Sequence, residues 1–347
     1  MNDVPLVSVI VVSYNVRRYL EKCLESIFRQ TYPRFEVWVV DNASSDGSLS
    51  LIRDRFPEVK LIENERNVGF AAAVNQAAAC AEGELVALLN PDAVASEDWL
   101  RNLVEAIRTK HVAQVAATVE TQVRSGKTSS GGSSLNILGY HVPGFFQDSD
   151  VTFFASGCSF MYHKDQIDIP FDADYFAYYE DVLLSWRLRL AGWTIKRVPE
   201  AKVWHRGGGS WSDDLRFQQW YYSERNRLLT LLTCYSGQTL LKIAPLLGLD
   251  ILWSLVSNWP KNLLGHGRPA GAFLMAYGWL LRNYVLIRQK RQSVQAERQV
   301  GDDAIIYYQT CKLCQDGGML GRLLNWGVGQ YCSLVGLRTW ELSARRQ

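Results

Sequence analysis

Apolar positions in the first 120 residues alternate between the spacing of buried strands and the spacing of amphipathic helices. The run at 7–13 is rich in β-branched residues, which is typical of a strand buried on both faces. Apolar residues then recur at helical spacing through Phe28, which predicts a helix that ends before Pro33. Further strands are predicted at 35–40, 59–63, 85–89 and 115–119. The intervening helices are predicted to end at Phe56, to span 70–81, and to include Trp99 to Ile107.

This alternation predicts an α/β fold, with a mostly parallel sheet covered by helices on both faces. Such sheets bind ligands beyond the carboxyl ends of their strands. Asp41 stands at the end of the second predicted strand, and Asn90-Pro91-Asp92 follows the fourth. The order of elements therefore predicts a polar site at this edge of the sheet.

The pattern changes after residue 120. Residues 121–150 are rich in Ser and Gly with little periodicity, so they predict a long loop near the site. Beyond it we expect an apolar segment at 153–162, a helix from about Glu180 to Ala191, short strands at 193–198 and 202–204, and long apolar helices from Leu228 onward. We therefore expect two domains, an α/β domain at 1–230 and a helical region at 231–347.

Charge is distributed unevenly along the 347 residues. The formal net charge is +2, yet thirteen Lys and Arg stand against six Asp and Glu from residue 240 onward. The front of the chain is therefore acidic and does not resemble a nucleic-acid binder. The seven Cys form no small disulfide framework, and the first residues lack the basic and apolar parts of a signal peptide. These features predict a cytoplasmic protein.

Six short motifs occur in an order typical of one enzyme family. They are Val7-Ser-Val-Ile-Val-Val-Ser-Tyr-Asn15, Val40-Asp-Asn-Ala-Ser-Ser-Asp-Gly-Ser48, Asn67-Val-Gly-Phe-Ala-Ala-Ala-Val-Asn75, Leu88-Leu-Asn-Pro-Asp92, Tyr179-Glu-Asp-Val182 and Trp204-His-Arg-Gly-Gly-Gly-Ser210. Over roughly residues 6–230 the chain resembles the bacterial inverting glycosyltransferases of family 2, with the Rossmann-like GT-A fold. The rhamnosyltransferase-like branch is the nearest resemblance.

The first three motifs resemble the family's binding site for the donor. Asp41 resembles the aspartate that reads the base, since a strand-end carboxylate can accept the imide N–H of uracil or thymine. Its alternative role is to cap the next helix. By the same resemblance, the remaining donor-binding residues are Ser13, Tyr14, Asn67, Gly69 and Asn75. Glycine would let the backbone approach the ligand, while Asn75 could equally belong to a packed helix entry.

The fourth motif occupies the place of the family's acidic metal motif, often Asp-x-Asp. Here the first carboxylate is the amide of Asn90, which the resemblance assigns to the donor site. The resemblance implies a divalent cation, Mg²⁺ or Mn²⁺, bound by Asp92 and by the donor diphosphate. A simple Pro-Asp turn is the alternative.

The sixth motif supplies the other residues expected near the diphosphate. His205 can, by the same resemblance, complete the metal shell. Residues 207–210, with three successive glycines, would let a loop close over the diphosphate. Arg206 and Arg225 are alternative partners for a phosphate group, and the sequence does not choose between them.

The fifth motif contains the candidate catalytic base. Asp181 resembles the aspartate of the family's Glu-Asp motif at a helix start, and we expect it to be ionised at neutral pH with a pKa near its usual value. It would take the proton of the acceptor hydroxyl. Glu180 would orient the acceptor or Asp181. The alternative is an acidic pair that stabilises the helix N-terminus.

The resemblance implies a single displacement with inversion, from dTDP-rhamnose or a UDP-hexose to a glycan or lipid-linked acceptor. A dinucleotide oxidoreductase would carry G-x-G-x-x-G after the first strand, and residues 13–18 do not. A processive synthase would need membrane spans and a Gln-x-x-Arg-Trp motif, which are not evident. A non-catalytic nucleotide-sugar-binding or scaffold protein remains the alternative.

The composition of the C-terminal region predicts that it binds to a membrane surface without spanning the membrane. The stretch from Thr239 to Trp259 is long enough to span, but Lys242, Pro245 and Asp250 interrupt it. A second apolar stretch, 270–281, is too short. Leu, Trp and nearby basic residues suit helices that lie at an anionic lipid surface, on the inner face of the cell membrane. A helical subdomain that packs on the catalytic domain or forms a homodimer is the alternative.

Overall fold

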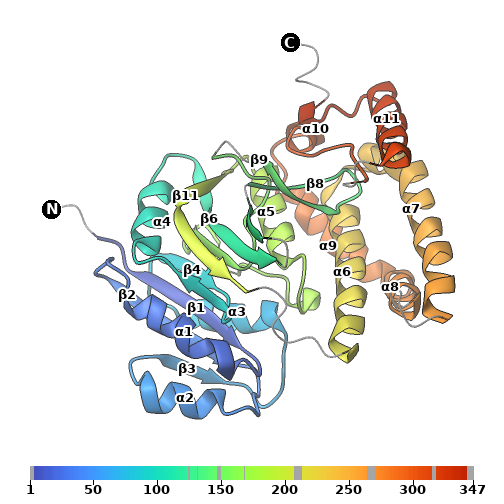
Figure 1. The fold of residues 1–347 in the computed structure, drawn as a ribbon. Coiled ribbons are helices and arrows are strands. Elements are labelled where there is room, and N and C mark those ends of the chain that lie inside the picture. Colours follow the sequence, from blue (N-terminus) through green and yellow to red (C-terminus); the bar gives the residue numbers. More distant parts are fainter. Residues whose placement is uncertain are drawn as a thin grey trace. The chain divides into compact units, whose positions relative to one another are not determined.

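The computed structural model describes residues 4–123, 126–130, 132–146, 150–167, 169–206, 213–263, 270–314 and 318–341. Its first half is built on a large mixed sheet (Figure 1). Four parallel strands lie in the order β3-β2-β1-β4, with bounds Lys60–Glu63, Phe35–Asp41, Val7–Ser13 and Leu85–Leu89. The predicted strands at 35–40, 59–63 and 85–89 are thus confirmed.

Beyond β4 the sheet becomes mixed. It continues with β10 (Ser159–His163), which is antiparallel to β4, and then with β6 (Val112–Val123), β11 (Thr194–His205) and β5 (Ala93–Ala95). The strand β7 (Gly126–Ser130) pairs with β6 off this path. The sheet is therefore parallel from β3 to β4 and mixed beyond it, because β10 and β5 pair antiparallel with their neighbours while β11 pairs parallel with β6.

Helices pack on the sheet through their buried side chains. They are α1 (Arg17–Phe28), α2 (Ser48–Arg55), α3 (Phe70–Cys80), α4 (Trp99–Ile107) and α5 (Glu180–Leu190). In α4 the predicted apolar stripe is fully inside, since each of its members is at most 3% exposed: Trp99, Leu100, Leu103, Val104 and Ile107. Burial of such side chains stabilises the fold by about 1.5–3 kcal/mol each.

Two predictions from the sequence are wrong. The loop expected at 121–150 contains the end of β6, all of β7, and the pair β8 (Gly132–Leu135) and β9 (His141–Phe146). The two short strands expected at 193–198 and 202–204 are one strand, β11, with a register shift between Val198 and Lys202. Strand pairing uses backbone groups, so Ser-rich and Gly-rich segments can pair without apolar alternation, and a bulge carries β11 past Pro199.

The chain divides into two compact units. Unit 1 comprises 1–132, 146–185 and 193–211, and unit 2 comprises 133–145, 186–192 and 212–347. Unit 2 contains the helices α6 (Asp213–Cys234), α7 (Gly237–Leu263), α8 (Ala270–Arg282), α9 (Tyr284–Ala296), α10 (Asp302–Ile306) and α11 (Met319–Leu334). The expected C-terminal helical region is present, and the predicted division at residue 230 falls inside α6.

A buried ion cluster ties three helices of unit 2 together. Arg227 of α6 lies 2.7 Å from Glu224 and 3.0 Å from Asp250 of α7. The Tyr140 hydroxyl donates to Asp250, and the Tyr277 hydroxyl of α8 donates to Glu224. Because the Arg227 and Glu224 side chains are only 1% and 4% exposed, the cluster fixes which face of α7 packs inward.

Candidate functional site

The carboxyl ends of β1 and β2 contain two buried polar atoms without a partner. Ser13 and Asp41 are neighbours in register, and Asp41 is 1% exposed. Asp41 Oδ1 accepts a bond from the Ser44 amide at 2.8 Å, while Asp41 Oδ2 and the Ser13 hydroxyl have no partner in the described part of the chain. A buried carboxylate oxygen left unpaired is costly, so this strand end is suited to a ligand N–H group.

The loops after β1 and β2 are bonded to each other around this point. Asn15 has a positive φ of 53°, and its Oδ1 accepts from the Ser45 amide at 2.8 Å. The Arg17 amide at the start of α1 donates to Asp46 at 2.7 Å. Tyr14, which the sequence assigned to donor binding, is 40% exposed beside them. The two motifs therefore form one preorganised rim at the sheet edge.

The third motif, residues 67–75, contacts the segment at 171–176 of unit 1. Asn67 Oδ1 accepts from the Gly69 amide at 2.9 Å, and Gly69 has a φ of +88°. A Cβ atom at Gly69 would lie 2.6 Å from Phe176, so glycine is required there for packing against protein. Asn75 exchanges two hydrogen bonds with the Phe171 backbone, at 2.7 and 3.1 Å. The donor-binding roles of Asn67, Gly69 and Asn75 stay predictions.

The two predicted metal ligands lie together. Asp92 Oδ1 is 3.0 Å from His205 Nε2, and both side chains are largely buried. The pairing of β5 with β11 causes this contact, since it places His205 in register with Ala93. No group of three or more His, Cys, Asp or Glu suited to a metal occurs in the part of the chain that the structure describes. A cation bound here would therefore need oxygen ligands from a bound molecule.

The segment at 157–158 links this pair to the candidate base. The Cys158 carbonyl accepts a hydrogen bond from the backbone N–H of Asn90 at 2.9 Å. The backbone N–H of Gly157 donates to Asp181 Oδ2 at 2.7 Å. Burial first, and then the charges of Asp92, Cys23 and Asp181, raise the pKa of the Cys158 thiol. Asp92 and Asp181 thus lie close to the same buried residue. Sequence reasoning missed Gly157, whose signal was a glycine two residues before a buried strand.

The start of α5 places two carboxyl groups in a dry environment. Burial raises the pKa of Asp181, although the amides of Gly157 and Val182 oppose the shift. The expectation of an unshifted pKa is therefore wrong. Burial and the neighbouring Asp181 charge raise the pKa of Glu180 well above its usual value, and Glu180 Oε2 has no partner among the described residues. At neutral pH the pair thus holds protons more tightly than two ordinary carboxyl groups.

The backbone before Glu180 is strained. Phe176, Tyr178 and Tyr179 have φ values of 62°, 70° and 68°. Non-glycine residues rarely adopt such values, and clusters of them concentrate at functional sites. Tyr175, just before these residues, is 1% exposed and packs against protein. The strain supports a site at the start of α5.

The two candidate phosphate partners differ in their surroundings. Arg206 is exposed, stands 5.1 Å from the centre of the Tyr19 ring, and its amide donates to the Asp92 carbonyl at 3.3 Å. Arg225 is buried in unit 2 among aromatic rings and donates to the Asn226 side chain. Of the two, Arg206 is the one beside Asp92. The glycine motif at 207–210 lies outside the described residues.

Part of the chain is similar in sequence to known glycosyltransferases. Residues 8–168 match the model of glycosyl transferase family 2. A putative teichuronic acid biosynthesis glycosyltransferase, TuaG of Bacillus subtilis, is 36% identical over 104 residues, which cover 29% of this chain and 41% of that protein. The chain thus spans about two fifths of this curated relative. Over residues 8–168 this chain therefore resembles the family 2 glycosyltransferases.

Solved structures show that the fold is GT-A, as expected. The mannosyltransferase PcManGT from Pyrobaculum calidifontis, in complex with GDP-Man and Mn²⁺, aligns with a TM-score of 0.51 at 21% identity over 85% of both chains. S. aureus TarS 1-349 in complex with UDP aligns with a TM-score of 0.50 at 19% identity, over 84% of this chain and 88% of that chain. Asp41 and Asp92 lie within the family 2 match, and Asp181 and His205 lie beyond it.

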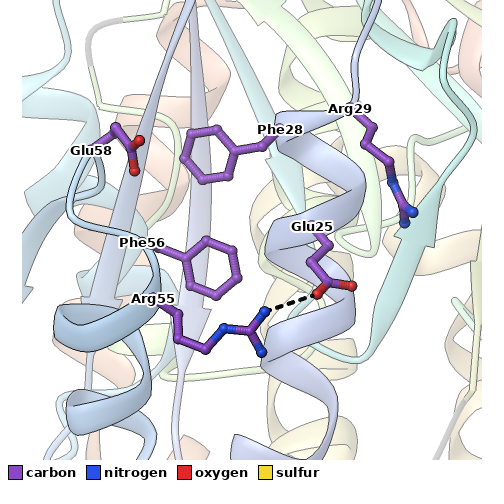
Figure 2. Close-up of a pocket in the computed structure, with 6 residues that line it drawn as sticks. All are labelled: Glu25, Phe28, Arg29, Arg55, Phe56 and Glu58. Carbon is purple, nitrogen blue, oxygen red and sulfur yellow. Dashed lines mark hydrogen bonds and ion pairs between the residues drawn. The ribbon is translucent and has the colours of Figure 1, made fainter.

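A pocket of about 480 Å³ in unit 1 lies elsewhere (Figure 2). It is lined by Glu25, Phe28, Arg29, Arg55, Phe56 and Glu58. These residues lie at or just after the C-terminal ends of α1 and α2. They are therefore near the amino ends of the parallel strands, whereas Asp41 lies at the carboxyl end of β2. Phe28 and Phe56 stack with ring centres 5.9 Å apart, and Arg55 pairs with Glu25 at 3.4 Å. The pocket is therefore separate from the candidate site.

Proposed function

We propose that this chain is an inverting glycosyltransferase that moves a sugar from a nucleoside-diphosphate sugar to a hydroxyl of a glycan or lipid-linked acceptor. The observation that carries the proposal is that Asp92, which pairs with His205, and Asp181 both lie beside the segment at 157–158. Asp41 ends β2 at the same edge of the sheet. Similarity to a protein of teichuronic acid biosynthesis supports a role in cell-surface polysaccharide synthesis.

The donor base would bind at Asp41. Its unpaired Oδ2 would accept the imide N–H of uracil or thymine, and Ser13 and Tyr14 would border the base and ribose. The UDP in the TarS structure supports a uridine nucleotide, and dTDP-rhamnose offers the same imide group. Arg206 would face the diphosphate.

Asp41→Asn is expected to weaken UDP or dTDP binding about 10–100-fold. The substitution places an amide N–H opposite the imide N–H and removes a charge-assisted hydrogen bond worth about 1.5–3 kcal/mol. Calorimetric titration with UDP and dTDP measures the change, and Asp54→Asn, at an exposed position of α2, is the control. Equal affinity for wild type and Asp41→Asn would remove Asp41 from the base site.

Asp92 and His205 fit a divalent cation, because a carboxylate and an imidazole face each other within 3.0 Å. With Mg²⁺ or Mn²⁺ bound there, the donor diphosphate would supply further oxygen ligands, and Asn90 could border them. The cation would neutralise charge that develops on the leaving diphosphate. The Mn²⁺ bound in the PcManGT structure supports this choice.

Asp92→Ala is expected to abolish the part of donor binding that depends on the cation. Thermal shifts with UDP-sugars and dTDP-sugars, with and without Mn²⁺, measure it, since a ligand that binds the native state raises the melting temperature. Asp98→Ala, an exposed carboxylate that precedes α4, is the control. Full turnover in excess chelator would refute the dependence on a cation.

Asp181 would act as the general base. Its raised pKa brings it closer to the working pH, which favours proton transfer. It would accept the hydroxyl proton while the acceptor oxygen attacks the anomeric carbon from the face opposite the diphosphate. Glu180 would position Asp181 or the acceptor. NMR of the product shows whether the anomeric configuration has been inverted. Formation of a glycosylated product when acceptor is added distinguishes an enzyme from a non-catalytic binding protein.

A lipid-linked acceptor would place the chain at the cytoplasmic face of the membrane. Among the residues that the structure describes, one helix, Gly237–Val256 within α7, is long and apolar enough to cross a membrane, and 17% of it is buried. A homodimer that covers the same helices is the competing arrangement, and size-exclusion chromatography with light scattering tests it.

A further inference from the structure

The helix α7 exposes a continuous apolar face. Its exposed residues from 241 to 256 recur at helical spacing and include no charged or polar side chain: Leu241, Ala244, Pro245, Gly248, Leu249, Leu252, Trp253 and Val256. At about 1.5 Å per residue the face runs for about 22 Å. Leu249 and Trp253 at its centre are 64% and 70% exposed. An apolar face of this length on a surface helix indicates a binding surface.

The opposite face of α7 is fixed to the rest of unit 2 by polar contacts. Asp250 accepts from the Tyr140 hydroxyl and from Arg227, which also pairs with Glu224. The Tyr331 hydroxyl of α11 donates to the Lys242 carbonyl at 2.7 Å. The apolar face can therefore not be turned inward without breaking the ion cluster.

These contacts also decide against a spanning arrangement. Asp250 lies at the middle of α7, and a charged residue at the centre of a bilayer costs about 2.5–3.5 kcal/mol or more. Its partners Arg227 and Glu224 would have to enter the hydrocarbon with it or lose their pairing. A helix that lies in the plane of the membrane satisfies both faces, since one faces the acyl chains and the other remains on protein.

Other helices of unit 2 also expose large apolar side chains. Figure 1 shows α7 at the edge of this unit, where it packs on α8. The large exposed apolar residues of α8 and α11 are Leu274, Met275, Leu281, Met319, Leu320, Leu323, Leu324, Trp326 and Leu334. Arg282 at the end of α8 and Arg288 on α9 are exposed. With thirteen basic against six acidic residues from 240 onward, the charge is complementary to anionic headgroups.

We propose that α7 docks in the plane of an anionic lipid surface, with Leu249 and Trp253 inserted at the acyl boundary and Asp250 holding the opposite face on unit 2. The inference deepens the proposed function, since a lipid-linked acceptor would lie at this surface. Binding itself requires neither donor nor acceptor, so the two can fail separately.

The test is flotation of the full-length protein with vesicles of phosphatidylglycerol mixed with phosphatidylcholine. Wild type should float, less so as salt rises, and should be released by an alkaline wash. The double variant Leu249→Glu/Trp253→Glu should bind at least about tenfold more weakly, because it removes two large inserted side chains. Ile169→Glu, at a residue of unit 1 that is 65% exposed, is the matched control and should bind as wild type.

Three outcomes would overturn the inference. The double variant could float as well as wild type, the wild type could resist the alkaline wash as a spanning protein does, or the full-length protein could fail to float and instead form a dimer that the double variant disrupts. Sugar transfer to a soluble acceptor is measured on the same preparations. If the protein did not float but still transferred sugar, only the docking proposal would be contradicted. If it floated but did not transfer sugar, only the proposed function would be contradicted.

Discussion

Asp181→Asn is expected to lower the rate of sugar transfer about 10²–10⁴-fold, the usual contribution of a general base. The amide cannot take the proton of the acceptor hydroxyl. Donor binding should change little, because the residues proposed to hold the donor, Asp41 and Asp92, are untouched. Initial rates with saturating donor measure the first effect, and thermal shifts with donor measure the second.

The matched control is Glu180→Gln. The pKa of Glu180 is raised well above its usual value, so the residue is more protonated than an ordinary Glu and glutamine imitates its neutral form. A loss smaller than that of Asp181→Asn is expected. If Glu180→Gln abolished transfer and Asp181→Asn retained it, the base would be Glu180.

The pH dependence of wild type follows from the same pair. The base must be deprotonated, so the rate should fall as the pH drops through the pKa of Asp181. Burial raises that pKa above its usual value of 3.8, so this acid limb should lie at a higher pH than for an exposed aspartate. The profile of kcat/KM against pH measures it, and Glu180→Gln should retain the limb.

Arg227→Ala is expected to lower the free energy of unfolding of unit 2 by about 3–5 kcal/mol, the usual effect of removing one partner of a buried ion pair. The variant would leave Glu224 almost fully buried without its cation and would remove one partner of Asp250. Chemical denaturation, followed by far-UV circular dichroism because unit 2 is helical, measures the loss.

The control is Arg53→Ala. Arg53 pairs with Glu63 at 2.6 Å, but the two side chains are 60% and 42% exposed. Pairs of this kind contribute about 0–1 kcal/mol. A loss for Arg227→Ala as small as that for Arg53→Ala would show that the ion cluster does not hold α7 in place.

The amino-acid sequence by itself determined the elements of the first 107 residues, except for the short strand β5, and the positions of Asp41 and Asp92 among them. Continuous apolar runs specify buried strands, and helical spacing specifies the helices that cover them. Asp41 and Asp92 were located by their places at or just after strand ends. The type of each element and the end of each strand are local properties, so neighbouring residues in the sequence contain the information that fixes them.

Only the tertiary structure decided which of these residues meet. The Asp92–His205 contact depends on the pairing of β5 with β11, and the Gly157 bond to Asp181 joins a loop to a distant helix start. The raised pKa of Asp181 depends on burial, which its neighbours in sequence do not reveal.

The same holds for the segments where the prediction was wrong. The strands between 121 and 150 form because backbone groups pair across the sheet, which needs no apolar alternation. In α7 the sequence shows an apolar helix with one acidic residue at its centre. The direction of the apolar face is set by the partners that Asp250 finds on α6 and at Tyr140, because a buried charge must be paired wherever the fold brings a partner to it.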